Sequence, residues 1–235
     1  MLVAAAVCPC PPLLVPEVAS GAAPELDAVR THCADALGVL AAARPDRLVV
    51  VAPAPEGGRG VFPAGSSGGF AGFGVDLSVR LGEGEGGGRP LPAALAVGAW
   101  LLSRAAGTGV PVEGFGVGER TGTEECAETG RSLAGSADRV ALLVLGDGSA
   151  CRTVKAPGYL DERAEPFDAE AARALGAADV PGVLALDAEL AYELKAAGRA
   201  PWQVLAGAAD GAGLSGRLLH ESAPYGVGYL VAVWS

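Results

Sequence analysis

The sequence predicts one α/β domain spanning 1–235, a mixed, largely parallel sheet flanked by helices and ending in a C-terminal hairpin. Three continuous apolar runs, at 2–8, 48–51 and 140–145, have the length of strands that are buried on both faces. Segments with helical periodicity separate these runs, as parallel strands require. Because no repeat and no linker-like boundary interrupts the chain, we expect a single domain.

The first helix is predicted to begin at Pro24, because proline is favoured in a first helical turn. The prolines at 9–16 oppose regular structure before it. Together with the runs at 2–8 and 48–51, the helix makes a strand–helix–strand unit, which predicts a parallel pair with a right-handed crossover. Its apolar positions share one stripe: Leu26, Val29, Cys33, Leu37 and Leu40.

The middle of the chain changes pattern. Residues 53–71 are rich in Pro, Gly and Ser and predict a loop. Strict alternation of apolar and polar residues at 75–81 predicts a half-exposed strand at a sheet edge. A helix is expected at 92–104, a strand at Val112–Val117 and another helix at 124–133.

The last third begins with a long loop at 151–167. Asp168 follows it, and we expect this residue to cap the N-terminus of the alanine-rich helix after it. Helical patterns continue through Trp202. The apolar segments at 217–220 and 227–234 flank a Pro-Tyr-Gly turn and predict the terminal hairpin.

Composition narrows the classes of partner and compartment. The formal net charge is −10, with 27 acidic and 17 basic residues, and no run of Lys or Arg occurs. Nucleic acids and anionic membranes both need a basic face, so neither is expected as a partner. No apolar stretch has the length of a membrane span, and the N-terminal segment lacks a basic leader. Five cysteines without disulfide-scaffold spacing favour a reducing, cytoplasmic location.

A candidate site follows from the position of the loops. In open α/β sheets, ligands bind beyond the carboxyl ends of the strands. The three buried runs lead into loops at 8–12, 52–58 and 146–152, so we expect any site to lie among them. Glu56, in the second loop, is a candidate ligand-binding residue.

One dense polar cluster follows the third buried run. It comprises Asp147, Ser149, Arg152, Lys155 and Tyr159. Two cations at a strand end in an acidic protein indicate a site for a carboxylate or phosphate. The alternative is equally open, because a loop rich in Gly and Pro often has no role beyond connecting two elements.

The order of elements and three short segments resemble the catalytic subunits of class III extradiol ring-cleavage dioxygenases, which are non-haem iron enzymes. The segments are Cys10-Pro11-Pro12 with its surroundings, 146–152 and the hairpin 224–229. In that family the first strand ends in His-Pro-Pro and the second in a Ser-Pro-His-like turn, and both histidines bind iron. Here the equivalent positions are Cys10 and Ala54, and the catalytic histidine position falls on or near Arg152.

These departures from the family pattern remove its chemistry. A facial triad for Fe(II) takes two imidazoles and one carboxylate. The family's glutamate ligand has only Glu189 and Glu193 as candidate positions here. Arg152 cannot serve as a general base, because its guanidinium stays protonated. We therefore expect a relative without a metal site or cofactor, which keeps a pocket for a small anionic or aromatic ligand. The resemblance also suggests a homodimer.

Two alternatives remain open from the sequence. In the first, the protein is an active iron dioxygenase whose Fe(II) is held by His220, Glu56 and Cys10. In the second, Cys10 is the nucleophile of a cysteine-dependent enzyme, activated by Arg152 or by a helix N-terminus. His220 is in either case a candidate pocket residue that reaches the site from the terminal hairpin. His32 lies off the apolar stripe of its helix, so we expect it to be exposed to solvent.

Overall fold

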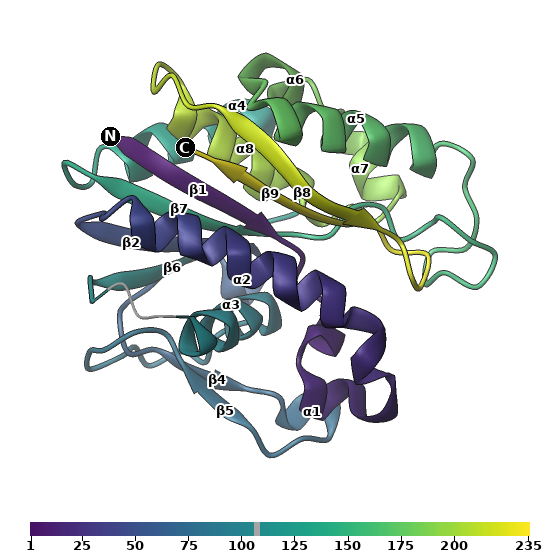
Figure 1. Ribbon diagram of the computed structural model, residues 1–235, viewed down its shortest axis with the longest axis horizontal. Coiled ribbons are helices and arrows are strands. Elements are labelled where there is room, and N and C mark those ends of the chain that lie inside the picture. The colour runs from purple at the N-terminus through teal and green to yellow at the C-terminus, as the bar shows by residue number, and fades with distance from the viewer. Residues whose placement is uncertain (106–108) are drawn as a thin grey trace.

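A computed structural model describes residues 1–105 and 109–235 and shows a sheet with helices on both faces (Figure 1). The strands are β1 (Leu2–Cys8), β2 (Arg47–Pro53), β3 (Gly60–Phe62), β4 (Ser67–Gly69), β5 (Ser78–Arg80), β6 (Val112–Val117), β7 (Val140–Leu145), β8 (Gly216–Ser222) and β9 (Tyr229–Trp234). The α-helices are α1 (Pro16–Ala19), α2 (Asp27–Ala42), α3 (Ala93–Arg104), α4 (Thr123–Ala134), α5 (Ala164–Ala177), α6 (Val180–Leu184), α7 (Ala188–Glu193) and α8 (Arg199–Ala209). Four short 3₁₀ helices are η1 (Pro12–Leu14), η2 (Ser20–Leu26), η3 (Glu56–Gly58) and η4 (Ala71–Phe73).

The main sheet has seven strands in the order β3-β6-β2-β7-β1-β9-β8. The four strands β6, β2, β7 and β1 are parallel, whereas β3 pairs antiparallel with β6 and β9 pairs antiparallel with β1. Strands β8 and β9 form an antiparallel hairpin at the C-terminus. The predicted fold class, a mixed and largely parallel sheet with flanking helices and a terminal hairpin, is confirmed.

One detail of the predicted topology is wrong. Strands β1 and β2 are parallel but are not neighbours, because β7 pairs with both of them, Val7 aligning with Val144 and Val50 with Leu143. All six residues of β7 are buried, which suits the centre of a sheet covered on both faces. Strand–helix–strand spacing predicts a crossover but does not say how many strands the helix crosses.

Helices cover the two faces of the sheet and make two cores. On one face α2 and α3 pack Leu40 and Leu95 against alternate residues of the strands, among them Val50 and Leu143. On the other face α5 and α8 pack Leu175 and Trp202 against the remaining strand residues. Most core side chains are Ala, Val and Leu, as the low aromatic content of the sequence requires, and a few aromatic side chains such as Trp202 and Trp234 are fully buried among them.

Several local predictions are wrong at element boundaries. The proline-rich segment after β1 is not irregular, since Pro12 and Pro16 each start a short helix, where a missing N–H costs nothing. Helix α2 begins at Asp27 and not at Pro24, which lies inside η2. Asp168 is not an N-cap: it lies in the second turn of α5, which starts at Ala164.

The segment 53–81 also differs from its prediction. The predicted loop at 53–71 contains η3 and the short strands β3 and β4. The alternating run at 75–81 forms only β5, which pairs with β4 in a separate two-stranded sheet and not at the edge of the main one. Alternation reports a strand with one exposed face, and it carries no information about which strand lies beside it.

Within 1–105 and 109–235, every helix is too short or too polar to cross a membrane.

Two glycines set the distance between α4 and α8, which pack closely against each other. A Cβ on Gly130 of α4 would collide with the Val204 carbonyl oxygen and lie 2.6 Å from the Ala208 nitrogen. A Cβ on Gly207 of α8 would in turn collide with the backbone of Ala127. The two helix backbones therefore touch, and only glycine fits at the contact.

We expect Gly130→Ala to lower the free energy of unfolding by about 3 kcal/mol, because an overpacked backbone contact can be relieved only by moving α8. The matched control is Gly38→Ala in the exposed face of α2, where a Cβ meets nothing within 4 Å. That change should raise stability by roughly 0.5–1 kcal/mol through helix propensity. Urea denaturation followed by circular dichroism measures both, and equal effects would contradict the close contact.

Candidate site at the carboxyl end of the sheet

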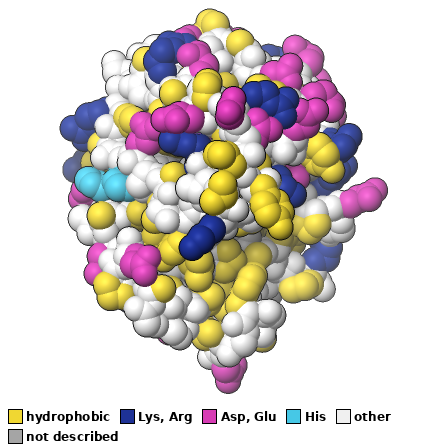
Figure 2. Space-filling view, turned by 90° about the vertical axis from the view of Figure 1, so that its right-hand side faces the viewer, with side chains coloured by type: hydrophobic (Ala, Val, Ile, Leu, Met, Phe, Trp, Pro, Cys, Tyr) yellow, Lys and Arg dark blue, Asp and Glu magenta, His cyan; other side chains and the backbone are white. Residues whose placement is uncertain are grey.

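A pocket of about 560 Å³ lies where the parallel strands end. Its residues come from the segments after β1, β2, β6 and β7 and from α3, α7 and the segment before α8. Figure 2 looks onto this end of the molecule and shows hydrophobic side chains around a hollow in its lower half, with charged side chains concentrated above. The lining residues are Cys10, Pro53, Ala54, Pro55, Glu56, Arg59, Pro92, Ala93, Ala94, Glu119, Arg120, Asp147, Tyr192 and Ala197. The pocket has the volume of a small-molecule site.

Asp147 lines this pocket two residues beyond β7. Its Oδ1 accepts a hydrogen bond from the Cys10 backbone nitrogen at 2.8 Å, and its carbonyl oxygen accepts one from the Gly198 nitrogen at 2.8 Å. Burial raises the pKa of Asp147 to about 7, although the Cys10 N–H bond opposes the rise. A carboxyl group with this pKa exists in both protonation states near neutral pH.

Cys10 is buried beside Asp147 and its thiol is not activated. Burial raises the pKa of the Cys10 thiol well above its usual value, and the Asp147 carboxylate raises it further. A cysteine nucleophile needs the opposite environment, with a cation or a helix N-terminus that stabilises the thiolate. Cys10 therefore contributes a neutral, apolar side chain to the pocket.

The opposite wall of the pocket is cationic and aromatic. The Arg120 guanidinium, in the loop after β6, lies 3.7 Å from the centre of the Tyr192 ring of α7. The Arg59 guanidinium packs against Gly118, at the start of the same loop. Within the part of the chain that the structure describes, neither arginine forms an ion pair.

Arg199, buried at the start of α8, holds the loop that carries Arg120. Its guanidinium donates to the Thr121 carbonyl oxygen at 2.6 Å, to the Glu119 carbonyl oxygen and to Gln203 Oε1 at 3.1 Å. The Gln203 amide nitrogen donates in turn to the Leu186 carbonyl oxygen at 3.0 Å, in the segment before α7. One buried pair of side chains thus connects the two segments that bring Arg120 and Tyr192 together.

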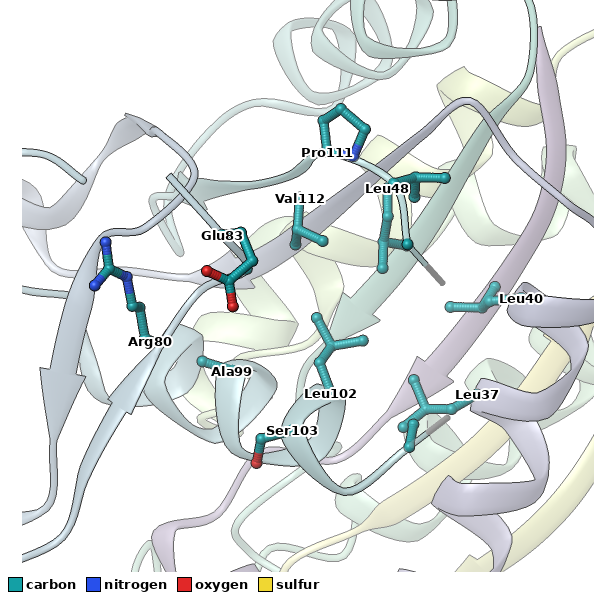
Figure 3. A pocket seen from close by; sticks show the side chains of 14 residues that line it. Leu37, Leu40, Leu48, Arg80, Glu83, Ala99, Leu102, Ser103, Pro111 and Val112 are labelled. Atoms are coloured by element: carbon teal, nitrogen blue, oxygen red, sulfur yellow. The ribbon is translucent and has the colours of Figure 1, made fainter. Parts of the chain in front are cut away.

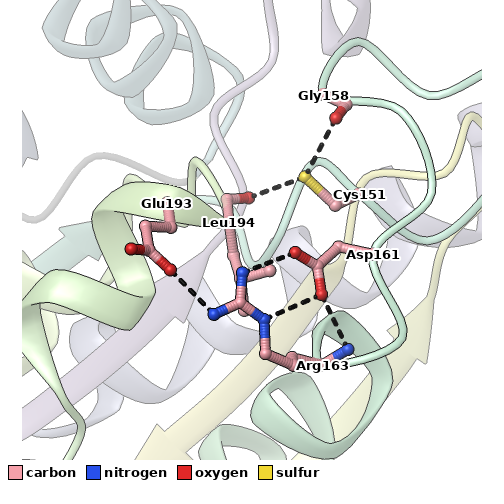
Figure 4. A network of polar contacts seen from close by, with 6 residues as sticks. All are labelled: Cys151, Gly158, Asp161, Arg163, Glu193 and Leu194. Carbon is pink, nitrogen blue, oxygen red and sulfur yellow. Dashed lines mark hydrogen bonds and ion pairs between the residues drawn. The ribbon is translucent and has the colours of Figure 1, made fainter.

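A second network attaches α7 to the loop after β7 (Figure 4). Arg163 donates to both Asp161 oxygens, at 3.0 and 2.7 Å, and to Glu193 Oε2 at 2.8 Å. The Cys151 thiol lies 3.4 Å from the Leu194 carbonyl oxygen and 3.5 Å from that of Gly158. These contacts fix α7, and with it the position of Tyr192.

The polar cluster predicted after β7 is divided by the fold. Only Asp147 of its members lines the pocket. Ser149 is fully buried and donates through its nitrogen and its hydroxyl to Asp168, at 2.7 and 2.8 Å. Arg152 pairs with Asp168 at 3.2 Å and with Glu165 at 3.5 Å, so its charge is already compensated. Lys155 and Tyr159 are exposed and outside the pocket lining.

The two histidines of the chain lie elsewhere and contact each other. The ring of His220, on β8, stacks on that of His32, on α2, with ring centres 5.1 Å apart. His220 Nε2 also lies 2.8 Å from Ser222 Oγ. Burial lowers the pKa of His220, and the neighbouring His32 lowers it further. His220 is therefore not one of the residues that line the pocket, contrary to the prediction. His32, predicted to be exposed, is half-buried with its ring stacked on that of His220.

The residues at the carboxyl ends do not fit an iron centre. Cys10 and Glu56 line the pocket, but no imidazole does, and across 1–105 and 109–235 no three His, Cys, Asp or Glu side chains are grouped to hold a metal ion. Glu193 is paired with Arg163, and Glu189 is exposed on α7. Fe(II) in a facial triad needs two imidazoles together with a carboxylate, and this pocket offers carboxylates but no imidazole.

The sequence predicted none of the residues of the cationic and aromatic wall. Arg59, Glu119, Arg120 and Tyr192 were not predicted as site residues. A signal for two of them existed, because Glu119 and Arg120 follow β6, a predicted strand whose carboxyl end belongs to the same edge of the sheet. No comparable signal marks Tyr192, which reaches the pocket from a helix more than forty positions after β7.

A second hollow, of about 740 Å³, lies at the opposite end of the strands (Figure 3). Leucines of α2 and α3, with Leu48 and Val112 from the starts of β2 and β6, form its floor, and Arg80 and Glu83 stand at its edge. Ala105 and Gly109, the last and first residues of the two described ranges, are among its lining residues. In parallel sheets this amino-terminal end is not where ligands usually bind.

Comparison with known proteins identifies the fold and no family. No protein-family model matches the chain, and no curated protein matches it. Among solved structures, the chain is similar to the uncharacterized protein JW3007 from Escherichia coli K12, with a TM-score of 0.57 and 13% sequence identity over 99% of each chain. At this identity the likeness concerns the architecture alone.

We expect Asp168→Ala to destabilise the protein by about 3 kcal/mol or more, since it leaves the buried Ser149 donors and Arg152 without their acceptor. Glu165→Ala, which removes the exposed partner of the same arginine, should change stability by less than about 0.5 kcal/mol. Chemical denaturation of both variants provides the measurement. A small loss for Asp168→Ala would show that the loop after β7 does not depend on this carboxylate.

Proposed function

We propose that the protein binds a small aromatic or anionic molecule in the pocket at the carboxyl end of the sheet, and that it works without iron. The proposal rests on one observation above the others, the Arg120 guanidinium stacked on Tyr192 at the wall of the pocket. A cation over a ring offers a ligand both a charge partner and a flat apolar surface.

The setting of this wall favours an anionic group on the ligand. Arg59 and Arg120 line the pocket together with the carboxyl groups of Glu56, Glu119 and Asp147, yet neither arginine forms an ion pair among the described residues. Apolar side chains of Pro53, Ala54 and Pro92 line the same space, which suits an aromatic or aliphatic body. Asp147 supplies an acceptor for a hydrogen-bond donor on the same ligand.

The sequence resemblance to class III extradiol dioxygenases is consistent with a site at this edge of the sheet, but the side chains do not support ring cleavage. Cys10 and Ala54 stand where the family has iron-binding histidines. A general base is also missing at Arg152, whose guanidinium pairs with Asp168. We therefore propose a relative of these enzymes in architecture that retains the pocket with different chemistry.

Arg120→Met should weaken the binding of a carboxylate ligand several-fold, because it removes a charge partner for the carboxylate at the solvent-exposed wall of the pocket. Benzoate, 4-hydroxybenzoate and inorganic phosphate serve as probes, measured by thermal shift and calorimetry. The control is Arg104→Met, which removes an arginine stacked on Trp100 outside the pocket lining.

Equal affinities in the two variants would contradict a role for Arg120, and the absence of binding by all three probes would contradict the proposed function.

Anaerobic incubation with Fe(II), followed by desalting and metal analysis, should leave far less than one iron per chain, since no imidazole lines the pocket. Addition of catechol in air should give no yellow ring-opened product. Stoichiometric iron that is lost in Cys10→Ser or Glu56→Gln would overturn the proposal and favour the iron-dependent alternative.

A further inference from the structure

We propose that Asp147 is the acid–base group of this pocket, and that its Oδ2 exchanges a proton with an acidic O–H or N–H group of the bound molecule. This inference rests on the proposed function and deepens it, because it turns a binding pocket into one that performs proton transfer. The ligand class it implies is a small molecule whose own ionisable group has a pKa within a few units of neutrality.

Hydrogen bonds hold both the side chain and the backbone of Asp147 in place. Cys10 N donates to Oδ1, and Gly198 N donates to the Asp147 carbonyl oxygen, each at 2.8 Å. A Cβ on the preceding Gly146 would collide with Gly198, so the chain before α8 lies directly against this turn. Because of these contacts, the carboxyl group holds its position when its protonation state changes.

The second oxygen of the carboxyl group is available to a ligand. No described residue donates a hydrogen bond to Oδ2, and no described cation pairs with the group. The same side chain lines the pocket. Asp168, the buried aspartate of α5, differs in this respect, because Ser149 and Arg152 occupy both of its oxygens.

The charged and titratable groups around Asp147 leave its proton affinity high. Those that face it or share its pocket are Cys10, Glu56, Arg59, Glu119, Arg120, Tyr192 and Tyr229. Neither arginine pairs with it, and Cys10 and Tyr229 stay neutral, because burial raises the pKa of both. Burial consequently dominates and raises the pKa of Asp147 to about 7, where a carboxyl group both donates and accepts protons.

The transfer is balanced without a further reactant. When the ionised carboxylate accepts, the ligand's O–H or N–H bond breaks, its electron pair stays on the ligand atom, and an O–H bond forms at Oδ2. The negative charge moves from Asp147 to the ligand, where Arg59 or Arg120 of the same pocket can stabilise it. The reverse step returns the proton and restores the carboxylate.

Carbon-13 NMR of the full chain, labelled at aspartate carboxyl carbons, tests the first requirement without any ligand. One resonance should titrate near pH 7 and be absent from Asp147→Asn, which keeps an oxygen for the Cys10 N–H. Asp161 provides the internal control, because Arg163 lowers the pKa of its carboxyl group to about 2, so its signal should not move between pH 5 and 9. An Asp147 resonance that titrates below pH 5 overturns the proposal.

Proton exchange itself is tested with 4-nitrophenol, whose absorbance reports its ionisation. Saturation with wild-type protein should shift the ionised fraction of the probe relative to buffer, and the shift should be lost in Asp147→Asn. A bound probe with the same ionisation in both proteins overturns the acid–base role while leaving the binding function intact. Arg120→Met, in contrast, should weaken binding of the probe and leave the titration of Asp147 in the NMR experiment in place.

Discussion

Strand β7 is the constraint on which the rest of the structure depends. It lies between β1 and β2, is covered on both faces, and contains no polar side chain. Binding or catalytic side chains cannot lie along such a strand, because an unpaired polar group buried there would cost several kcal/mol. Polar residues can appear only once the strand has ended, and Asp147 is the first of them. Strand β1 likewise has no charged side chain, and apart from Pro53 at the end of β2, the strands β1, β2 and β6 contribute to the pocket through the segments that follow them.

The loops after these strands are held by two kinds of interaction. Asp168 accepts hydrogen bonds from Ser149 and Arg152 and so attaches the loop after β7 to α5. Arg199 and Gln203 use α8 to bind carbonyl oxygens in the segments before α4 and α7. Buried polar groups of this kind are stabilising when they have partners, and the Asp168 carboxylate, the two terminal nitrogens of Arg199 and the Gln203 amide all bind backbone groups outside helices and strands, although Arg199 Nε has no partner among the described residues. Rigid loops result, and they give the pocket a defined shape.

The fold also decides which charged side chains already have a partner and which remain free to bind a ligand. Arg152 is near the end of a central strand, yet Asp168 and Glu165 compensate it. Arg120 lies outside the segments that the sequence singled out, yet it lines the pocket and its guanidinium packs on the Tyr192 ring. His220 and His32 stack on each other between α2 and β8 and supply nothing to the site. Which charge remains free for a ligand is therefore a property of the packing, and residue type alone does not reveal it.

The sequence by itself determined the α/β class, the buried strands, the terminal hairpin and the edge of the sheet at which the pocket of Asp147 lies, because hydrophobic periodicity and the rule for parallel sheets depend on local pattern. Only the tertiary structure decided that β7 separates β1 from β2, that Asp168 is a buried acceptor within α5, and that Arg120, Tyr192 and Asp147 line one pocket. Those outcomes depend on contacts between residues far apart in the chain, and such contacts leave no periodic trace in the sequence.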